Sequence, residues 1–227
     1  MAKPSIYQRI RTIHELLLEH YGDGDWWRAS SADEVVIGAV LTQNTNWLNV
    51  EKALANLRSA GLLSKHRAEV GTAPSLSSIA AMPGDILAAL IRPAGYHNIK
   101  ARRLQAVAKH LCCYIPPSDT DEFRRYLLAC HGIGKETADS ILLYGFGRIV
   151  FVIDAYTIRL FSRLGLISPD ISYDEAQQVF QRALPQDLST YTILHANIVI
   201  HSKTLCHKRP LCPDCFLQNH CLWQSRS

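Results

Sequence analysis

Apolar residues recur at every third or fourth position along most of the chain, which is the period of an amphipathic helix. The first such stretch carries Ile6, Ile10, Ile13 and Leu17 and stops at Gly22. Further stretches with this period cover residues 32–43, 48–61, 75–82, 83–91, 98–113, 121–130, 135–144, 155–167, 173–185 and 188–206. The pattern therefore predicts an all-α protein.

Local signals for helix ends agree with this pattern, with one segment as an exception. Ser31 with Glu34, and Ser172 with Glu175, have the spacing of a capping box, in which two side chains satisfy amides at a helix start. Residues 148–153, Arg-Ile-Val-Phe-Val-Ile, have the β-branched composition of a strand. A single strand would have no partner in an otherwise helical chain, so we predict no sheet.

The helices predicted at 121–130 and 135–144 are joined by a turn in which Gly132 and Gly134 flank Ile133. Residues without a Cβ allow backbone amides to approach a bound phosphate closely. Asp154 follows the second helix and begins the next one. A Gly-x-Gly turn is a weak signal by itself, and the order of turn, helix and aspartate strengthens it.

Four of the seven cysteines lie close together near the C-terminal end of the sequence, with the spacing C-x5-C-x2-C-x5-C. These are Cys206, Cys212, Cys215 and Cys221. Four thiolates in one short loop can bind a compact metal centre, either zinc or a [4Fe–4S] cluster, and the spacing does not distinguish the two. Lys208 and Arg209 lie inside this loop, where an ordered backbone would present them to DNA phosphates.

The composition is that of a globular protein, with 48% hydrophobic and 19% charged residues. The net charge of +4 is only mildly basic, so charge alone does not identify a nucleic-acid binder. The N-terminal sequence lacks the apolar core of a signal peptide, and no apolar run reaches the roughly 20 residues of a membrane span. We expect a cytoplasmic monomer without membrane association, near the nucleoid if the source is prokaryotic.

The hairpin, Asp154 and the cysteine loop resemble those of the helix-hairpin-helix, Gly/Pro-Asp superfamily of DNA glycosylases, which includes endonuclease III. The resemblance covers almost the whole chain. It implies two lobes: a six-helix barrel-like domain at 30–150 that ends in the hairpin, and a discontinuous helical domain at 1–29 and 151–227. The endonuclease III group carries a [4Fe–4S] cluster on C-x6-C-x2-C-x5-C. The loop at 206–221, one residue shorter in its first interval, is expected to hold this cluster, with zinc as the alternative.

The resemblance also assigns roles at the hairpin and after it. The backbone amides of Ile133, Gly134 and Lys135 would bind DNA phosphates. Asp154 would face the sugar C1′ and stabilise an oxocarbenium-like transition state, as carboxylates do in glycosidic cleavage. The plainer interpretation of Asp154 is a helix N-cap, and both roles can hold at once.

Glu136 determines the reaction type that the resemblance implies. Members that cleave the DNA strand read Leu-Pro-Gly-Val-Gly-Arg-Lys-Thr-Ala at the hairpin, and this chain has Glu136 where they have the lysine. A carboxylate cannot form a Schiff base with C1′. Lys135 is adjacent but points about 100° away around a helix, and it is expected to contact phosphate. The sequence thus predicts a monofunctional glycosylase that leaves an abasic site.

The segment Leu-Thr-Gln-Asn-Thr at 41–45, followed by Trp47, looks most like the 3-methyladenine DNA glycosylase III branch. In that superfamily a side chain at the position of Asn44, with Gln43 beside it, enters the duplex where the target base has left. Helix capping is the alternative role for this segment. In the branch, an aromatic residue at the position of Trp47 and a tryptophan from the preceding loop, here Trp26 or Trp27, sandwich the base.

Alkylated purines such as 3-methyladenine and 7-methylguanine would suit this pocket. They are flat cations and good leaving groups, so aromatic faces and the negative charge of Glu136 would favour them. The predicted partner is double-stranded DNA with damaged bases. Aromatic residues in such a loop can instead pack over the core.

Two other functions stay open at this stage. The protein could be an endonuclease III-like glycosylase for oxidised pyrimidines, with lyase activity through Lys135. It could also be a non-catalytic DNA-binding module that docks through the hairpin and the cysteine loop. We interpret Arg102 and Arg103 as solvated helix charges, and Cys112 and Cys113 as ordinary thiols.

Overall fold

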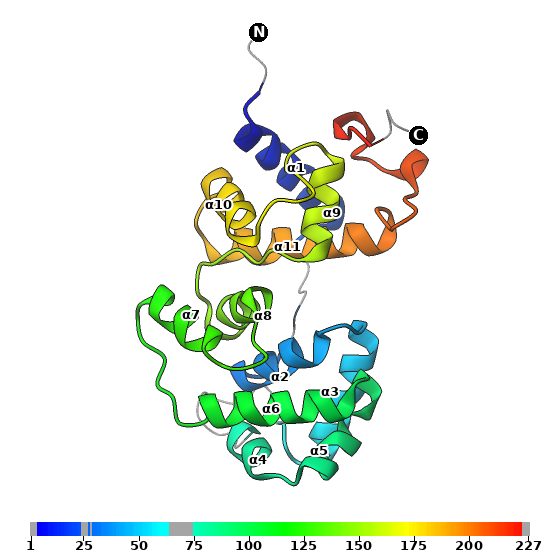
Figure 1. Ribbon diagram of the computed structural model, residues 1–227. Coiled ribbons are helices and arrows are strands. Elements are labelled where there is room, and N and C mark those ends of the chain that lie inside the picture. Colours follow the sequence, from blue (N-terminus) through cyan, green and yellow to red (C-terminus); the bar gives the residue numbers. More distant parts are fainter. Residues whose placement is uncertain (1–3, 24–26, 28, 64–74, 224–227) are drawn as a thin grey trace. The chain divides into compact units, whose positions relative to one another are not determined.

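The structure, a computed structural model, describes residues 4–23, 27, 29–63 and 75–223 (Figure 1). The α-helices in these ranges are α1 (Ile6–Tyr21), α2 (Ala32–Thr42), α3 (Trp47–Ser59), α4 (Ser75–Ala81), α5 (Gly84–Leu90), α6 (His97–Leu111), α7 (Thr120–Leu128), α8 (Lys135–Ser140), α9 (Ala155–Arg163), α10 (Tyr173–Ala183) and α11 (Leu188–Thr204). The described residues contain no strand, and the predicted all-α fold is confirmed.

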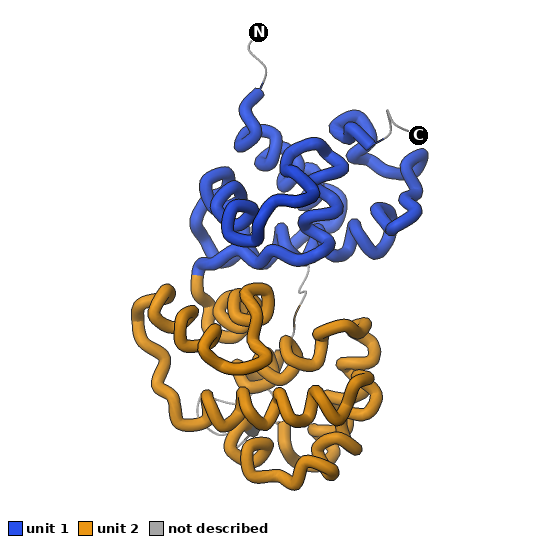
Figure 2. Tube along the Cα trace, in the orientation of Figure 1, with its two compact units in different colours: residues 1–26, 149–227 blue, residues 27–148 orange. Residues whose placement is uncertain are grey.

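The chain forms two compact units, shown in different colours in Figure 2. One unit is Trp27–Arg148, and the other combines Met1–Trp26 with Ile149–Ser227. The lobes expected from the sequence, 30–150 and 1–29 with 151–227, stay a domain prediction whose boundaries differ from these units by a few residues.

Helix α2 forms the centre of the unit Trp27–Arg148. All of its residues from Glu34 to Leu41 are buried. It packs against α3, α4, α6 and α8. This burial on every side explains the nearly continuous apolar run at 35–41, because a helix without a solvent-facing side needs no polar stripe.

In the other unit, α11 holds the N-terminal helix α1 against the C-terminal part of the chain. It packs against α1 and α9, and α1 also packs against α10. The Asn197 side chain donates hydrogen bonds to the Leu17 carbonyl at 3.4 Å and to the Gly22 carbonyl at 3.0 Å. The N-terminal helix is therefore fixed by a residue of the last long helix.

The apolar segment that precedes Asp154 is extended and buried, but it does not form a strand. Phe151 and Val152 are fully buried. Side chains rather than a neighbouring strand satisfy its backbone: Gln177 donates to the Phe151 carbonyl at 2.6 Å, and the Ile153 amide donates to the Tyr173 hydroxyl at 3.4 Å. These contacts replace the sheet that its composition would otherwise favour.

The predicted helix starts are correct at one capping box and half correct at the other. Ser172 and Glu175 form the full reciprocal box. Ser31 caps α2 by accepting from the Glu34 amide, but the Glu34 carboxylate bonds to Ser30 and Arg58 instead. Arg58 gives the buried Glu34 carboxylate a charged partner, which is a stronger hydrogen-bond donor than the Ser31 amide would be.

The helix predicted at 135–144 changes its geometry part-way. Helix α8 ends at Ser140 and continues as one π-helical turn, Ile141–Gly145, which packs against α2. A π-helical turn is rare and often marks a functional region.

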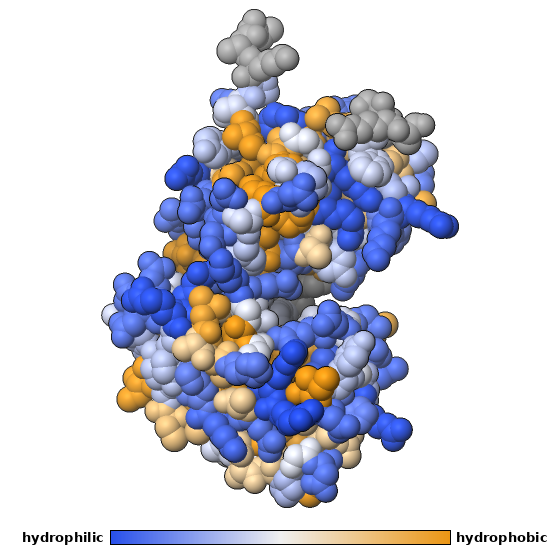
Figure 3. Space-filling model, in the orientation of Figure 1, coloured by the Kyte–Doolittle hydropathy of each residue, from blue (hydrophilic) through white to orange (hydrophobic). Residues whose placement is uncertain are grey.

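The surface is mixed in character. On the face shown in Figure 3, hydrophilic residues cover most of each unit and apolar residues form smaller areas between them. Among the described residues, no helix combines the length and the apolar character that crossing a membrane requires.

Candidate active site

The hairpin between α7 and α8 has the predicted glycine turn. Gly132 has a φ of 94°, which favours glycine, and Gly134 is the N-cap of α8. The Ile133 amide donates to the Cys130 carbonyl at 3.1 Å, and the side chain is buried. In this structure the turn itself uses this amide, and its contact with a phosphate stays a prediction. The Gly134 amide donates to no backbone carbonyl among the bonds of the described turns and loops.

An ion pair joins the two helices of the hairpin. Arg124 in α7 donates to both carboxylate oxygens of Asp139 in α8, at 2.6 and 3.0 Å. Asp139 is fully buried, so the pair is largely protected from solvent screening. The pair fixes the position of α8 relative to α7.

The Gln43 side chain connects the end of α2 to the hairpin. Its amide nitrogen donates to the Gly132 carbonyl at 3.0 Å and to the Thr137 hydroxyl at 3.2 Å. Its oxygen accepts from Arg103 at 2.9 Å. Gln43, predicted to contact DNA, is thus occupied within the protein.

Arg103 is not the solvated charge that we expected. Besides its bond to Gln43, its side chain lies against Gly132, where a Cβ would stand 3.1 Å from the arginine Cγ. Gly132 is therefore needed both for its backbone conformation and for this contact. Arg102 is exposed, as predicted.

Asn44, the predicted residue that enters the duplex, is exposed and has a φ of 56°, which is unusual for a residue with a side chain. Tyr96, in the loop before α6, shares both properties, with a φ of 46° and 68% of its surface exposed. Both turns depend on Lys100, whose ammonium group donates to the Leu41 carbonyl at 2.9 Å and the Ala94 carbonyl at 2.7 Å.

Sequence reasoning missed this role of Lys100. The residue is 2% exposed although it carries a charge. The available signal was its spacing, because Lys100 falls on the helix face of Leu104, Val107 and Leu111, all of which point into the core. A lysine on such a face needs acceptors, and helix and turn carbonyls supply them here.

The tryptophans predicted to line the base pocket pack on one another. Trp27 contacts Trp47 edge to face, with ring centroids 5.1 Å apart, and Tyr144 at 5.2 Å. Gly38 lies beneath them, and a Cβ there would stand 2.9 Å from the Trp27 ring. Trp47 also donates to Glu51 at 2.8 Å. We call Trp27, Trp47 and Tyr144 the aromatic cluster.

This packing corrects the expected sandwich. Two rings in direct contact leave no space for a base between them, so a base would have to stack on the outside of the pair or separate it. Trp26, the other candidate for the second face, lies outside the described residues.

Lys135 and Glu136 are both exposed at the start of α8, where a carboxylate is favoured by the helix dipole.

Asp154 is the N-cap of α9, as predicted. Its Oδ1 accepts hydrogen bonds from the Thr157 amide at 2.7 Å and the Thr157 hydroxyl at 2.8 Å. Its Oδ2 lies 3.7 Å from Nε2 of His195 in α11. Burial on its own would raise the pKa of Asp154, but the contact with His195 and the bonds from Thr157 outweigh it and hold the pKa below its ordinary value.

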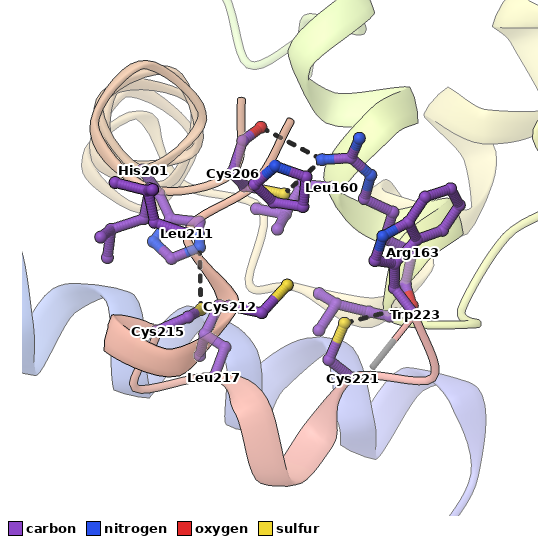
Figure 4. Close-up of a pocket in the computed structure, with 13 residues that line it drawn as sticks. Leu160, Arg163, His201, Cys206, Leu211, Cys212, Cys215, Leu217, Cys221 and Trp223 are labelled. Carbon is purple, nitrogen blue, oxygen red and sulfur yellow. Dashed lines mark hydrogen bonds between the residues drawn. The ribbon is translucent and has the colours of Figure 1, made fainter. Parts of the chain in front are cut away.

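The four cysteines of the C-terminal loop line one cavity (Figure 4). Two arginines of α9 hold the loop backbone. Arg159 donates to the Cys206 carbonyl at 3.0 Å, and Arg163 donates to the His207 carbonyl at 2.6 Å and the Lys208 carbonyl at 3.0 Å. Arg163 also donates to the Cys206 sulfur at 3.1 Å.

These contacts leave the side chains of Lys208 and Arg209 exposed, as a phosphate-contacting role would require. In the described ranges, no three His, Cys, Asp or Glu side chains lie close enough together to hold one metal ion between them. The loop order expected from metal binding is thus supplied in part by α9, which the sequence alone did not indicate.

Comparison with known proteins decides the family. Residues 37–186 match the model of the HhH-GPD superfamily base excision DNA repair proteins. The chain belongs to this superfamily. It is 43% identical to "Putative DNA repair glycosylase MJ1434" of Methanocaldococcus jannaschii over 97% of this chain and 99% of that protein. It is 29% identical to endonuclease III of Thermotoga maritima over 85% of this chain and 83% of that protein.

Among solved structures, the chain is similar to the 3-methyladenine DNA glycosylase MagIII of H. pylori, bound to 1,N6-ethenoadenine. The TM-score is 0.71 and the identity 30%, covering 88% of this chain and 98% of MagIII. As an HhH-GPD protein with named glycosylases as relatives, the protein is a DNA N-glycosylase. The superfamily resemblance inferred from the hairpin, Asp154 and the cysteine loop is confirmed, and a purely non-catalytic role is set aside.

Proposed function

We propose that this HhH-GPD glycosylase excises alkylated purines, such as 3-methyladenine and 7-methylguanine, without cleaving the DNA strand. The observation that carries the substrate class is the aromatic cluster of Trp27, Trp47 and Tyr144. A cationic purine gains from stacking on such rings, whereas an uncharged oxidised pyrimidine gains less. Among the described residues, Trp27 Nε1 is buried without a hydrogen-bond acceptor, so separation of the ring pair by a base would also expose this donor.

The absence of strand cleavage rests on Glu136. A Schiff base at C1′ needs an amine nucleophile, and the residue at this hairpin position is a carboxylate. Hydrolysis needs instead a group that stabilises positive charge on the sugar. Asp154 suits that role, because its depressed pKa keeps it ionised at neutral pH and its Oδ2 is not used by Thr157.

The reaction then requires little proton transfer to the base. An N-alkylated purine leaves as a neutral molecule when its glycosidic bond breaks, so a general acid is unnecessary. The target base must first leave the stack, and Asn44 would fill the space that it vacates. The similarity to MagIII, whose name specifies 3-methyladenine, supports this substrate class.

We propose a [4Fe–4S] cluster bound by the cysteine loop, with zinc as the alternative. The donor chemistry fits: four thiols line one cavity together with the apolar side chains of Leu160 and Leu217. Arg163, which donates to the Cys206 sulfur, would offset the negative charge of the thiolates. The cluster would order the loop that presents Lys208 and Arg209.

Iron, sulfide and zinc analysis of anaerobically purified protein tests this cofactor. We expect about four iron and four sulfide per chain with broad absorbance near 400 nm. A colourless protein that contains only zinc would contradict the cluster. We also propose a cytoplasmic monomer, which size-exclusion chromatography with light scattering would check.

A base-release assay on methylated double-stranded DNA tests the function. Wild-type protein should release 3-methyladenine and 7-methylguanine and leave intact strands with abasic sites. Trp47→Ala should reduce release, and Asp154→Asn should abolish it. If Trp47→Ala released bases at the wild-type rate while Asp154→Asn did not, the aromatic pocket would be wrong and the catalytic assignment intact.

The second candidate function is that of an endonuclease III-like glycosylase and lyase for oxidised pyrimidines. Similarity to the T. maritima endonuclease III and the exposed Lys135 next to Glu136 favour it. Borohydride trapping on abasic DNA separates the two, because only an amine nucleophile gives a covalent adduct. An adduct lost in Lys135→Gln would establish this alternative.

A further inference from the structure

The two oxygens of the Asp154 carboxylate have different surroundings. Oδ1 accepts two hydrogen bonds from Thr157, which is the usual capacity of one carboxylate oxygen. Oδ2 takes no part in the N-cap. His195 lies beside it, with Nε2 at 3.7 Å.

His195 comes from a different helix and is held beside Asp154 by packing. Helix α11, which carries His195, packs against α9, which Asp154 begins. Both side chains are 9% exposed. A carboxylate contact buried to this extent is weakened far less by salt and water than a contact on the surface. The distance is slightly longer than a hydrogen bond, so a small movement on DNA binding would complete one.

We propose that His195 is a positioning residue for Asp154: its Nε2–H, paired with Oδ2, fixes the plane of the carboxylate during base excision. This inference rests on the proposed catalytic role of Asp154. Together with the amide and hydroxyl of Thr157, His195 gives the carboxylate three donors in two directions. Oδ2 then keeps one lone pair, which faces the developing sugar cation or orients the attacking water.

Lys203, two turns further along α11, also interacts with Asp154. Partial burial lowers the pKa of Lys203, and the negative charge of Asp154 opposes that shift. The Lys203 side chain is exposed and long, so it contributes charge without fixing geometry. The imidazole, with two rotatable bonds and a buried site, is the group that can define the orientation of the carboxylate.

Two substitutions and a control test this role. His195→Gln keeps a hydrogen-bonding side chain without the imidazole ring, and His195→Leu removes the hydrogen-bonding group as well. His14→Gln is the control, since His14 is a partly buried histidine of α1 in the same unit. Each protein is measured in single-turnover release of 7-methylguanine from duplex DNA, which yields the maximal rate and the DNA dissociation constant separately. The Asp154 carboxyl ¹³C resonance, assigned by its loss in Asp154→Asn, is titrated by NMR without DNA.

We expect His195→Gln to lower the maximal rate by about 10- to 100-fold with DNA affinity changed less than about twofold, and His195→Leu to lower it further. The Asp154 carboxyl should titrate at a higher pH in both variants, because the contact with His195 then no longer opposes the rise in pKa that burial causes. His14→Gln should match wild type in both measurements. His195→Gln carries the test if His195→Leu does not fold.

An unchanged titration overturns the proposal, whatever the rate, because His195 would then not act on the carboxylate. A shifted titration with an unchanged rate also overturns it, because the contact would not serve the reaction. If wild-type protein releases no alkylated purine, the proposed function fails, and the NMR titration alone decides whether His195 acts on Asp154.

Discussion

Asp154 illustrates how one residue can serve structure and chemistry through different atoms. Its Oδ1 caps α9 through Thr157, and its Oδ2 is left for another partner. The two interpretations raised by the sequence, N-cap and catalyst, therefore do not compete for the same oxygen. Asparagine at this position should cap the helix almost as well, because its side-chain oxygen can also accept from the Thr157 amide.

We accordingly predict that Asp154→Asn folds normally and loses base excision. The free energy of unfolding should change by less than about 1 kcal/mol, while the maximal rate falls by at least about 100-fold because the negative charge is gone. Urea unfolding and single-turnover base release measure the two quantities. A variant that is inactive because it is unfolded would contradict this separation of roles.

The same carboxylate predicts the acid side of the pH profile. Because the folded pKa of Asp154 is held below its ordinary value of 3.8, the group stays ionised as pH falls from neutral to that value. Its contribution to stability is complete above the unfolded pKa and is lost as pH falls through the folded one. We expect Asp154→Asn to show a weaker loss of stability in acid than wild type, as measured by thermal unfolding between neutral pH and pH 3.

Lys100 is the second residue whose loss should have a specific cost. Lys100→Met fits the same space but leaves the Leu41 and Ala94 carbonyls without their charged donor. We predict a loss of about 3 kcal/mol in the free energy of unfolding, from two buried acceptors. The exposed neighbour Arg102 provides the control, and Arg102→Met should stay within about 0.5 kcal/mol. Equal effects of the two substitutions would argue against the bridging role.

At the scale of elements, the hairpin is held by the Arg124–Asp139 pair. Arg124→Met would leave a buried carboxylate without its cation, and we predict a destabilisation of about 3–5 kcal/mol. Arg125→Met, at an exposed position one residue along α7, should cost little. Chemical denaturation of both variants checks this, and a loss of less than about 1 kcal/mol in Arg124→Met would show that the pair is replaceable.

Helix positions could be predicted from the sequence because period and capping are local properties. Gly22, Ser172 and Asp154 end or begin helices through neighbours within four residues. The partners of Gln43 and Arg103 could not be predicted, because they depend on which helices pack together. Its position on the helix suggested a solvated charge, whereas Arg103 donates to the Gln43 oxygen and lies against Gly132 of the hairpin turn.

For the candidate site too, the sequence identifies the residues but does not show which of their groups are accessible. The identities of Asp154, Glu136 and the cysteines follow from motifs that stand in the sequence. The use of the Ile133 amide within its own turn and the direct contact of Trp27 with Trp47 follow from backbone path and ring packing. Those features decide which groups are accessible to DNA, and a motif specifies residues rather than accessibility.

At the scale of the whole molecule, the cysteine loop belongs to only one of the two units. Its backbone contacts come from Arg159 and Arg163, both in α9. We predict that Cys215→Ser, which removes one thiolate, accelerates amide hydrogen exchange in α9 and α11 by about 10- to 100-fold. Exchange in α2 and α3 should be unchanged.

Cys112→Ser is the matched control, because Cys112 is an exposed cysteine of the other unit. It should alter neither the exchange pattern nor the metal content. Hydrogen–deuterium exchange with mass spectrometry resolves these helices. If Cys215→Ser accelerated amide hydrogen exchange equally in both units, the loop would stabilise the protein as a whole and not only its own unit.

The hydrogen bonds from Asn197 to the Leu17 and Gly22 carbonyls have a consequence for synthesis on the ribosome. Helix α1 is made first, but the helix that fixes it is translated only after the entire unit Trp27–Arg148. That middle unit is continuous in sequence and can fold as it emerges. The nascent chain must therefore carry α1 with its apolar face uncovered until α10 and α11, the two helices that pack against it, leave the exit tunnel. A chaperone bound to the nascent chain would matter most during this interval.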